Sequence, residues 1–111
     1  MILEMRKIGI TKELIKEVVQ KIVQHFHPKK VILFGSCAHG KIGPDSDIDL
    51  FLIMKSNLRR DKRAIEVDNL FSDRLFPLDV LVYTPEEVEL SLRRNNFFIK
   101  EILTQGKVFY G

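Results

Sequence analysis

Residues 31–54 read VILFGSCAHGKIGPDSDIDLFLIM, and they decide the fold because they hold two apolar runs joined by a turn-rich segment. The first run, residues 31–34, is short and wholly apolar, which is typical of a buried strand that ends at Gly35. The second run, residues 48–54, is apolar on both faces, which predicts a central strand of a sheet. Glycine, proline and small polar residues dominate positions 37–46 and predict a loop between the two strands.

The rest of the chain predicts four helices and two further strands around this pair. Thr11 is a suitable helix cap, Pro28 ends the first helix, and Thr84-Pro-Glu-Glu is a strong start for the third. The expected elements, in chain order, are a helix from about residue 12 to residue 26, the strands 31–34 and 48–54, a helix within residues 58–75, a strand over 78–83, helices over 85–94 and 97–104, and a short edge strand over 107–110. This order predicts one mixed α/β domain.

Length and composition fit a single globular domain over residues 1–111. A chain of 111 residues, 45% hydrophobic and 30% charged, has room for one core. Its longest apolar runs are too short to cross a bilayer, and its first residues do not have the pattern of a secretion signal. The single cysteine, Cys37, has no internal partner for a disulfide, which fits a reducing cytoplasm. We therefore expect a cytoplasmic protein with no membrane association.

The charge is mildly basic, with a formal net charge of +3 and a pI near 9.1. The excess lies in short clusters at residues 29–30, 59–63 and 93–94. Solvated helix ends and faces are the favoured explanation of the clusters, and a rim that attracts a polyanion or an acidic partner is the alternative. This balance suits a phosphate-bearing ligand, and it does not require direct binding of nucleic acid.

Three aspartates occur in segments that otherwise read as core. Asp47 and Asp49 are two residues apart, so on a strand they would project to the same face. Asp79 stands at the start of the third predicted strand. Carboxylates beside an apolar sheet are costly unless a cation pairs with them, and Mg²⁺ prefers carboxylate and phosphate oxygens. The three aspartates therefore predict a site for Mg²⁺, with room for two ions around one phosphoryl group.

The turn at Gly35-Ser36 completes the predicted site. It follows a buried strand and could open as a helical turn, a place where backbone N–H groups and a hydroxyl meet phosphate oxygens. Each feature alone has a structural explanation, since Gly-Ser turns are common and an Asp-x-Asp pair can cap a loop. The combination of Gly-Ser, then Asp-Ile-Asp, then an aspartate opening an apolar strand is much more specific.

These residues resemble the signature of a known family. Phe34-Gly-Ser-Cys-Ala-His-Gly40 with Asp45-Ser-Asp-Ile-Asp-Leu50 is similar to the motif of the minimal nucleotidyltransferases, a branch of the DNA polymerase beta superfamily. The resemblance implies a polymerase-beta-like fold, a small mixed β-sheet flanked by helices. It implies that Gly35 and Ser36 contact the triphosphate, with His39 and Ser46 as further candidates for nucleotide binding. It also implies that Asp47, Asp49 and Asp79 bind the metals, Asp79 helping to deprotonate the attacking hydroxyl.

The same resemblance predicts a partner. Members of this family are often paired with a helical HEPN-type toxin, and the expected activity is then that of an antitoxin that transfers AMP from ATP to a tyrosine of the toxin, in a hetero-oligomer. One departure from the family pattern is that Cys37 and His39 stand where basic residues are common, and neutral histidine binds phosphate more weakly than arginine does. A non-catalytic antitoxin that neutralises its partner by direct binding therefore remains the alternative. An antibiotic-modifying enzyme would need a second domain to hold the drug.

Overall fold

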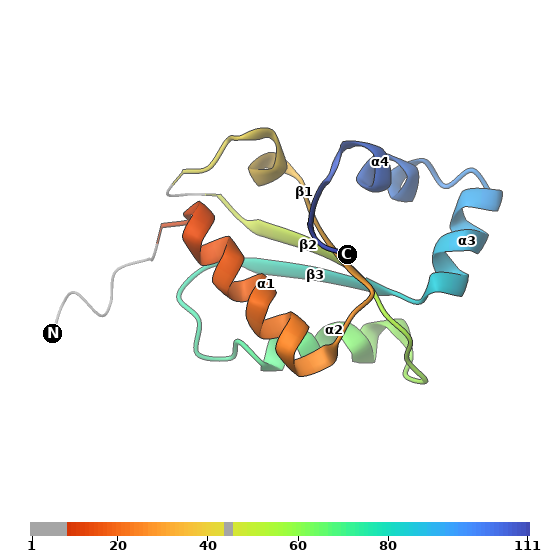
Figure 1. Cartoon of the computed structure of the whole chain (residues 1–111), viewed down its shortest axis with the longest axis horizontal. Coiled ribbons are helices and arrows are strands. Elements are labelled where there is room, and N and C mark those ends of the chain that lie inside the picture. Colours follow the sequence, from red (N-terminus) through yellow and green to blue (C-terminus); the bar gives the residue numbers. More distant parts are fainter. Residues whose placement is uncertain (1–8, 44–45) are drawn as a thin grey trace, which may run out of the picture.

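The computed structural model describes residues 9–43 and 46–111, which form a four-stranded sheet with helices packed against it (Figure 1). The elements in chain order are α1 (Lys12–Phe26), β1 (Lys30–Phe34), the 3₁₀ helix η2 (Ser36–His39), β2 (Ile48–Ile53), α2 (Arg60–Asn69), β3 (Leu78–Tyr83), α3 (Pro85–Arg93), α4 (Phe97–Gln105) and β4 (Lys107–Tyr110). The strand order is β3-β2-β1-β4, with β1 antiparallel to β2 and to β4, and β2 parallel to β3. This mixed sheet flanked by helices confirms the predicted fold class.

One face of the sheet carries the larger core, which is covered by α1 and α2. The α1 helix begins where the Thr11 hydroxyl accepts a bond from the Leu14 N–H at 3.1 Å, and it ends at His27, a left-handed residue just before Pro28. The buried residues of this core come from both helices and from alternate positions of the strands, and they include Ile15, Val18, Ile22, Val31, Leu33, Leu50, Leu52, Val67 and Val82. Apolar side chains continue along the whole of this face.

The opposite face carries a smaller core, which is covered by α3 and α4. The intervening strand positions supply Ile32, Phe51 and Tyr83, and the helices supply Val88, Ile99 and Ile102. We refer to these two surfaces as the α1/α2 face and the α3/α4 face. Because β2 alternates between them, it is buried on both sides, which confirms that it is central. No helix in the described residues combines the length and the apolar character needed to cross a membrane.

Two expectations differ from the structure. The α2 helix ends at Asn69, although an apolar stripe extends toward Leu75. After Asn69 the chain turns, and the Arg74 side chain donates to the carbonyls of Phe71 and Phe76 at 3.1 Å, which fixes a non-helical path toward β3. Asp47 lies one residue before β2, so it is a loop residue, whereas Asp47 and Asp49 were expected on one strand with both side chains on the same face.

An ion pair that joins α2 to α3 supports the end of the sheet remote from the aspartates. Arg63, which is 6% exposed, donates to Glu87 Oε1 at 2.5 Å and to the Leu58 and Val82 carbonyls at 2.8 and 3.2 Å. Glu87 also accepts from the Thr84 N–H at 2.9 Å, and the Thr84 hydroxyl accepts from the Glu87 N–H at 3.1 Å. This capping box confirms the helix start predicted at Thr84, and it fixes α3 to the sheet.

Candidate functional site

Strand register places two of the predicted aspartates together on the α3/α4 face. Asp49 of β2 is the direct partner of Asp79 of β3 in the parallel ladder, and it is also the antiparallel partner of Phe34 at the end of β1. Partners in a ladder project to the same side of the sheet, so these three side chains form one row across the strands. Asp49 is half-buried within the row, and Asp79 is exposed.

Within residues 9–43 and 46–111, the carboxylates of this row have no positive partner. The pKa of Asp49 is raised above its usual 3.8, first by burial, then by the negative charges of Asp79 and Asp47, and by a hydrogen bond with Asp79. Among the described residues, no lysine, arginine or histidine forms an ion pair with any of the three aspartates. Crowded oxygen ligands without a counter-charge fit a hard divalent cation such as Mg²⁺.

The three aspartates do not form a closed metal site by themselves. Within residues 9–43 and 46–111, no group of three or more histidine, cysteine, aspartate or glutamate side chains is close enough to hold an ion. Asp47 is exposed and influences Asp49 through its charge, whereas Asp79 is the direct ladder partner of Asp49. The structure therefore provides a carboxylate pair with a third carboxylate nearby. Such an incomplete shell leaves positions for substrate phosphates and water, the ligands that Mg²⁺ usually keeps.

The predicted phosphate turn passes directly over Asp49. Gly35 has φ 76° and ψ −159°, a conformation that residues with a side chain rarely adopt. A Cβ atom at this position would also overlap the Asp49 carboxylate oxygen Oδ2. Both the backbone conformation and the lack of space thus require glycine here. Ser36 is exposed and is the first residue of η2. The prediction that this turn opens as a helical turn is therefore confirmed.

The loop between η2 and β2 is held by polar side chains at its base. The Cys37 thiol donates to the Asp47 carbonyl at 3.0 Å, and burial raises the pKa of this thiol. The Ser46 hydroxyl accepts from the Gly43 N–H at 2.8 Å and donates to the Lys41 carbonyl at 2.9 Å. Ser46 was predicted to bind nucleotide, and in this structure its hydroxyl stabilises the loop. Cys37 and Ser46 together fix the approach of the chain to Asp47.

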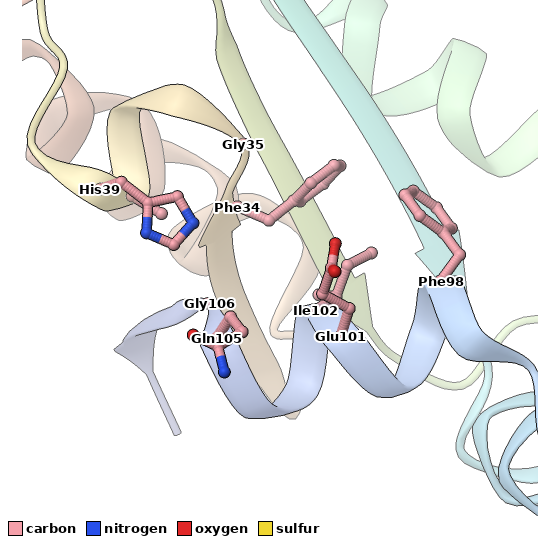
Figure 2. A pocket seen from close by; sticks show the side chains of 9 residues that line it. Phe34, Gly35, His39, Phe98, Glu101, Ile102, Gln105 and Gly106 are labelled. Atoms are coloured by element: carbon pink, nitrogen blue, oxygen red, sulfur yellow. The ribbon is translucent and has the colours of Figure 1, made fainter.

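A pocket of about 230 Å³ lies beside the Gly35 turn, between the end of β1 and α4 (Figure 2). His39 is exposed and lines this pocket, away from the Asp49–Asp79 pair. The remaining lining residues are Phe34, Gly35, Ala38, Phe98, Glu101, Ile102, Gln105 and Gly106. Sequence reasoning missed the α4 side of this site. The pattern from Phe97 onward indicated only an apolar helix, and the packing of α4 beside β1 is a long-range contact with no local signal.

Comparisons with known proteins agree with this arrangement. The family model described as "Nucleotidyltransferase domain" matches residues 12–108, which is most of the chain. A solved structure titled "Crystal structure of a putative nucleotidyltransferase from Sulfolobus solfataricus at 1.40 A resolution" is similar, with 22% sequence identity and a TM-score of 0.59. The match covers 87% of this chain and 77% of the other, and at this identity it supports the fold alone. A search of curated proteins finds no match.

Proposed function

This chain belongs to the nucleotidyltransferase domain family, and from that membership we propose that it transfers AMP from ATP to a hydroxyl group of a partner protein. The family supports nucleotidyl transfer in general. The identity of the nucleotide, of the metal and of the acceptor is our proposal.

The strongest support for catalysis is the row formed by Asp49 and Asp79 beneath the Gly35 turn. A single backbone turn that requires glycine lies against a carboxylate with a raised pKa, and a second carboxylate is its register partner. Burying charge in this way is unfavourable for the folded protein in the absence of a cation. A phosphate turn placed against such a pair is what a metal-dependent phosphoryl-transfer site needs, since the metal must touch both carboxylate and phosphate oxygens.

In the proposed site, Asp47, Asp49 and Asp79 would hold Mg²⁺, and two ions fit three carboxylates that leave ligand positions open. When bound, Mg²⁺ would supply neutralisation of the negative charge on the phosphates. Gly35 and Ser36 would bind the triphosphate through backbone N–H groups and the Ser36 hydroxyl. The exposed Asp79 carboxylate would accept the proton of the attacking hydroxyl. The acceptor oxygen bonds to the α-phosphorus, the bond between the α-phosphorus and its bridging oxygen breaks, and pyrophosphate leaves.

The acceptor that we propose is a tyrosine of a HEPN-type toxin, for which this chain would act as antitoxin. The support for this part is the resemblance of residues 34–50 to the minimal nucleotidyltransferases. In the described residues, Asp79 at the end of the carboxylate row is exposed. A bound partner would then supply both the hydroxyl and part of the wall around the site.

Labelled ATP tests the reaction directly. Mixed with Mg²⁺ and a candidate HEPN-type toxin, the protein should label a toxin tyrosine from [α-³²P]ATP and not from [γ-³²P]ATP. Asp79→Ala should abolish the label, and Asp73→Ala should not, because Asp73 is an exposed aspartate in the turn after α2. Label from [γ-³²P]ATP would indicate a kinase, and equal labelling by wild type and Asp79→Ala would refute the catalytic assignment.

A second candidate function is neutralisation by binding alone. It is favoured by His39, which stands where the family commonly has a basic residue and lies in the pocket beside the turn. Weaker binding of triphosphate would then leave the site idle. Relief of toxicity by wild type and Asp79→Ala alike, with no label on the toxin, would select this function over transfer.

A further inference from the structure

The pocket between β1 and α4 opens on the same face as the carboxylate row. Phe34, which lines it, is the ladder partner of Asp49, and Gly35, which also lines it, passes over the Asp49 carboxylate. A ligand held by the Gly35 turn and the aspartates is therefore adjacent to this pocket. The pocket has a volume of about 230 Å³, and Asp79 is not among the residues that line it.

Away from the Gly35 turn, the lining of the pocket suits a planar ring better than a phosphate. The nine lining residues include no lysine or arginine, their one histidine is His39, and their one acidic side chain is Glu101, which would repel a phosphate. The other walls are mostly apolar. Figure 2 shows the Phe34 ring and the Phe98 ring extending toward one another from β1 and α4, with the Glu101 carboxylate pointing from α4 toward Phe34. This part of the pocket therefore disfavours a charged triphosphate tail and accepts an uncharged base.

The two aromatic rings form a corner. The centroids of Phe34 and Phe98 are 6.0 Å apart and the ring planes meet at 85°, an edge-to-face arrangement. Phe98 is 50% exposed although it is a large apolar residue next to the site. A nucleobase that stacks on the face of Phe98 would cover this exposed surface, and such stacking contributes substantially to nucleotide affinity in other proteins.

Polar groups at the rim can read the edge of a base. The Glu101 carboxylate only accepts hydrogen bonds, whereas the Gln105 amide accepts and donates. A glutamine is complementary to adenine, whose exocyclic amine donates beside a ring nitrogen that accepts. A carbonyl at the position of that amine, as in hypoxanthine, could not receive a hydrogen bond from the Glu101 carboxylate, which has no proton to donate. The rim therefore favours a base that carries an exocyclic amine.

We propose that this pocket binds the base of the nucleoside triphosphate, and that Phe98, Glu101 and Gln105 make adenine the preferred base. This inference rests on the proposed function, because it takes the Gly35 turn and the aspartates as the site of the phosphates. It assigns α4, which holds none of the motif residues, the role of selecting the nucleotide.

Calorimetric titration in Mg²⁺ tests the stacking role with two ligands, ATP and inorganic tripolyphosphate, which has no base. Phe98→Ala should weaken ATP binding roughly tenfold, and it should leave tripolyphosphate binding unchanged. Leu92→Ala is the control, since Leu92 is a 41% exposed apolar residue of α3 that lines neither this pocket nor the adjoining cavity. Equal effects of Phe98→Ala on both ligands, or no effect on ATP, would overturn the proposal.

A single tryptophan reports the same contact without relying on affinity. The chain contains no tryptophan, so Phe98→Trp introduces the one indole of the protein. Its emission should change when ATP is added and stay constant with tripolyphosphate. An emission that responds equally to both ligands, or to neither while ATP binds by calorimetry, would place the base elsewhere.

Base selection is tested with ATP and inosine triphosphate, in which a carbonyl replaces the amine. The wild type should prefer ATP, and Gln105→Leu or Glu101→Gln should reduce that preference severalfold. Glu89→Gln serves as control because Glu89 is an exposed glutamate of α3 that does not line the pocket. A wild type that binds both nucleotides equally would refute the selection. Failure of the wild type to bind either ATP or tripolyphosphate would instead refute the proposed function, and this inference with it.

Discussion

The two faces of the sheet are built from the same strands and differ in what the strands bury. On the α1/α2 face, apolar side chains run the full length of β1 and β2 and pack against two helices. On the α3/α4 face, Phe34 at the end of β1 still packs against the core, but its row partners in β2 and β3 are the carboxylates Asp49 and Asp79. In β2, Leu50 is fully buried on one side while its neighbour Asp49 is half-buried among carboxylates on the other.

Within a single strand, the residues on one face therefore stabilise the fold, and residues on the other face form the candidate site. Alternation along a strand lets adjacent residues serve opposite faces, so a fully packed face can support a face that holds unfavourable charge. The α1/α2 face should then dominate the free energy of unfolding, and the end of the α3/α4 face should dominate ligand binding. The following substitutions test this division, from the largest expected effect on stability to the smallest.

Leu50→Ala should cause the largest loss, about 2–5 kcal/mol in the free energy of unfolding, because it opens a cavity in the packed α1/α2 face. Urea denaturation followed by circular dichroism measures it. Asp79→Ala, at an exposed position on the opposite face, is the comparison and should change stability little. Similar losses for the two variants would show that the faces do not divide these roles.

Gly35→Ala should cost about 1–3 kcal/mol, because Gly35 has a conformation rarely open to other residues and its added Cβ would displace the Asp49 carboxylate. The cost in binding should be larger than the cost in stability, and ATP should no longer raise the melting temperature in Mg²⁺. For the wild type, ligand at a hundred times its dissociation constant should add about 2.7 kcal/mol. A Gly35→Ala protein that ATP still stabilises fully would contradict the role of the turn.

Glu87→Gln should cost about 1–3 kcal/mol, because it leaves the buried Arg63 without its negative partner while glutamine preserves the capping box. Burial alone would raise the pKa of Glu87, but its bonds from Arg63 and the Thr84 backbone and the charges of Arg63 and Arg60 outweigh burial and hold the pKa below 4.5. The stabilisation is therefore present above pH 4.5 and is lost as the pH falls through the lowered value. Urea midpoints measured across this range should show the acid-side loss in the wild type and not in Glu87→Gln.

Asp49→Asn should have the smallest effect and the opposite sign, a slight gain in stability without metal. The pKa of Asp49 is raised above 3.8 in the folded protein, so the folded state holds the proton of this carboxyl more tightly than the unfolded state does. The free energy of unfolding therefore falls as the pH rises from 3.8 through the raised value. Asparagine removes that fall, and it should also abolish AMP transfer. An Asp49→Asn protein that is clearly less stable than the wild type at neutral pH would mean that Asp49 is structural.

Much of this arrangement is predictable from local sequence. Apolar runs identify β1 and β2 because each of these signals lies within a single element. The family resemblance is carried by the motif residues 34–40 and 45–50, which are close together in the chain. The early end of α2 depends on the Arg74 bonds to nearby carbonyls, which no apolar stripe encodes. The position of Asp47 outside β2 depends on where the ladder with β3 begins. The pocket and the ion pair of Arg63 with Glu87 join residues far apart in the chain, and one sequence does not show such contacts.

The parallel ladder of β2 and β3 also has a consequence for folding fidelity. Asp49 meets Asp79 only in one register, and a slip of one residue would turn Asp79 toward the packed α1/α2 face and bring Val80 to its place. The two strands are separated in the chain by α2, so no tight hairpin turn enforces their alignment. A chain that collapses with the wrong register would keep most of its secondary structure and separate Asp49 from Asp79, the pair proposed to hold Mg²⁺. Under that proposal, Mg²⁺ affinity would be a stricter assay of correct folding than helical content.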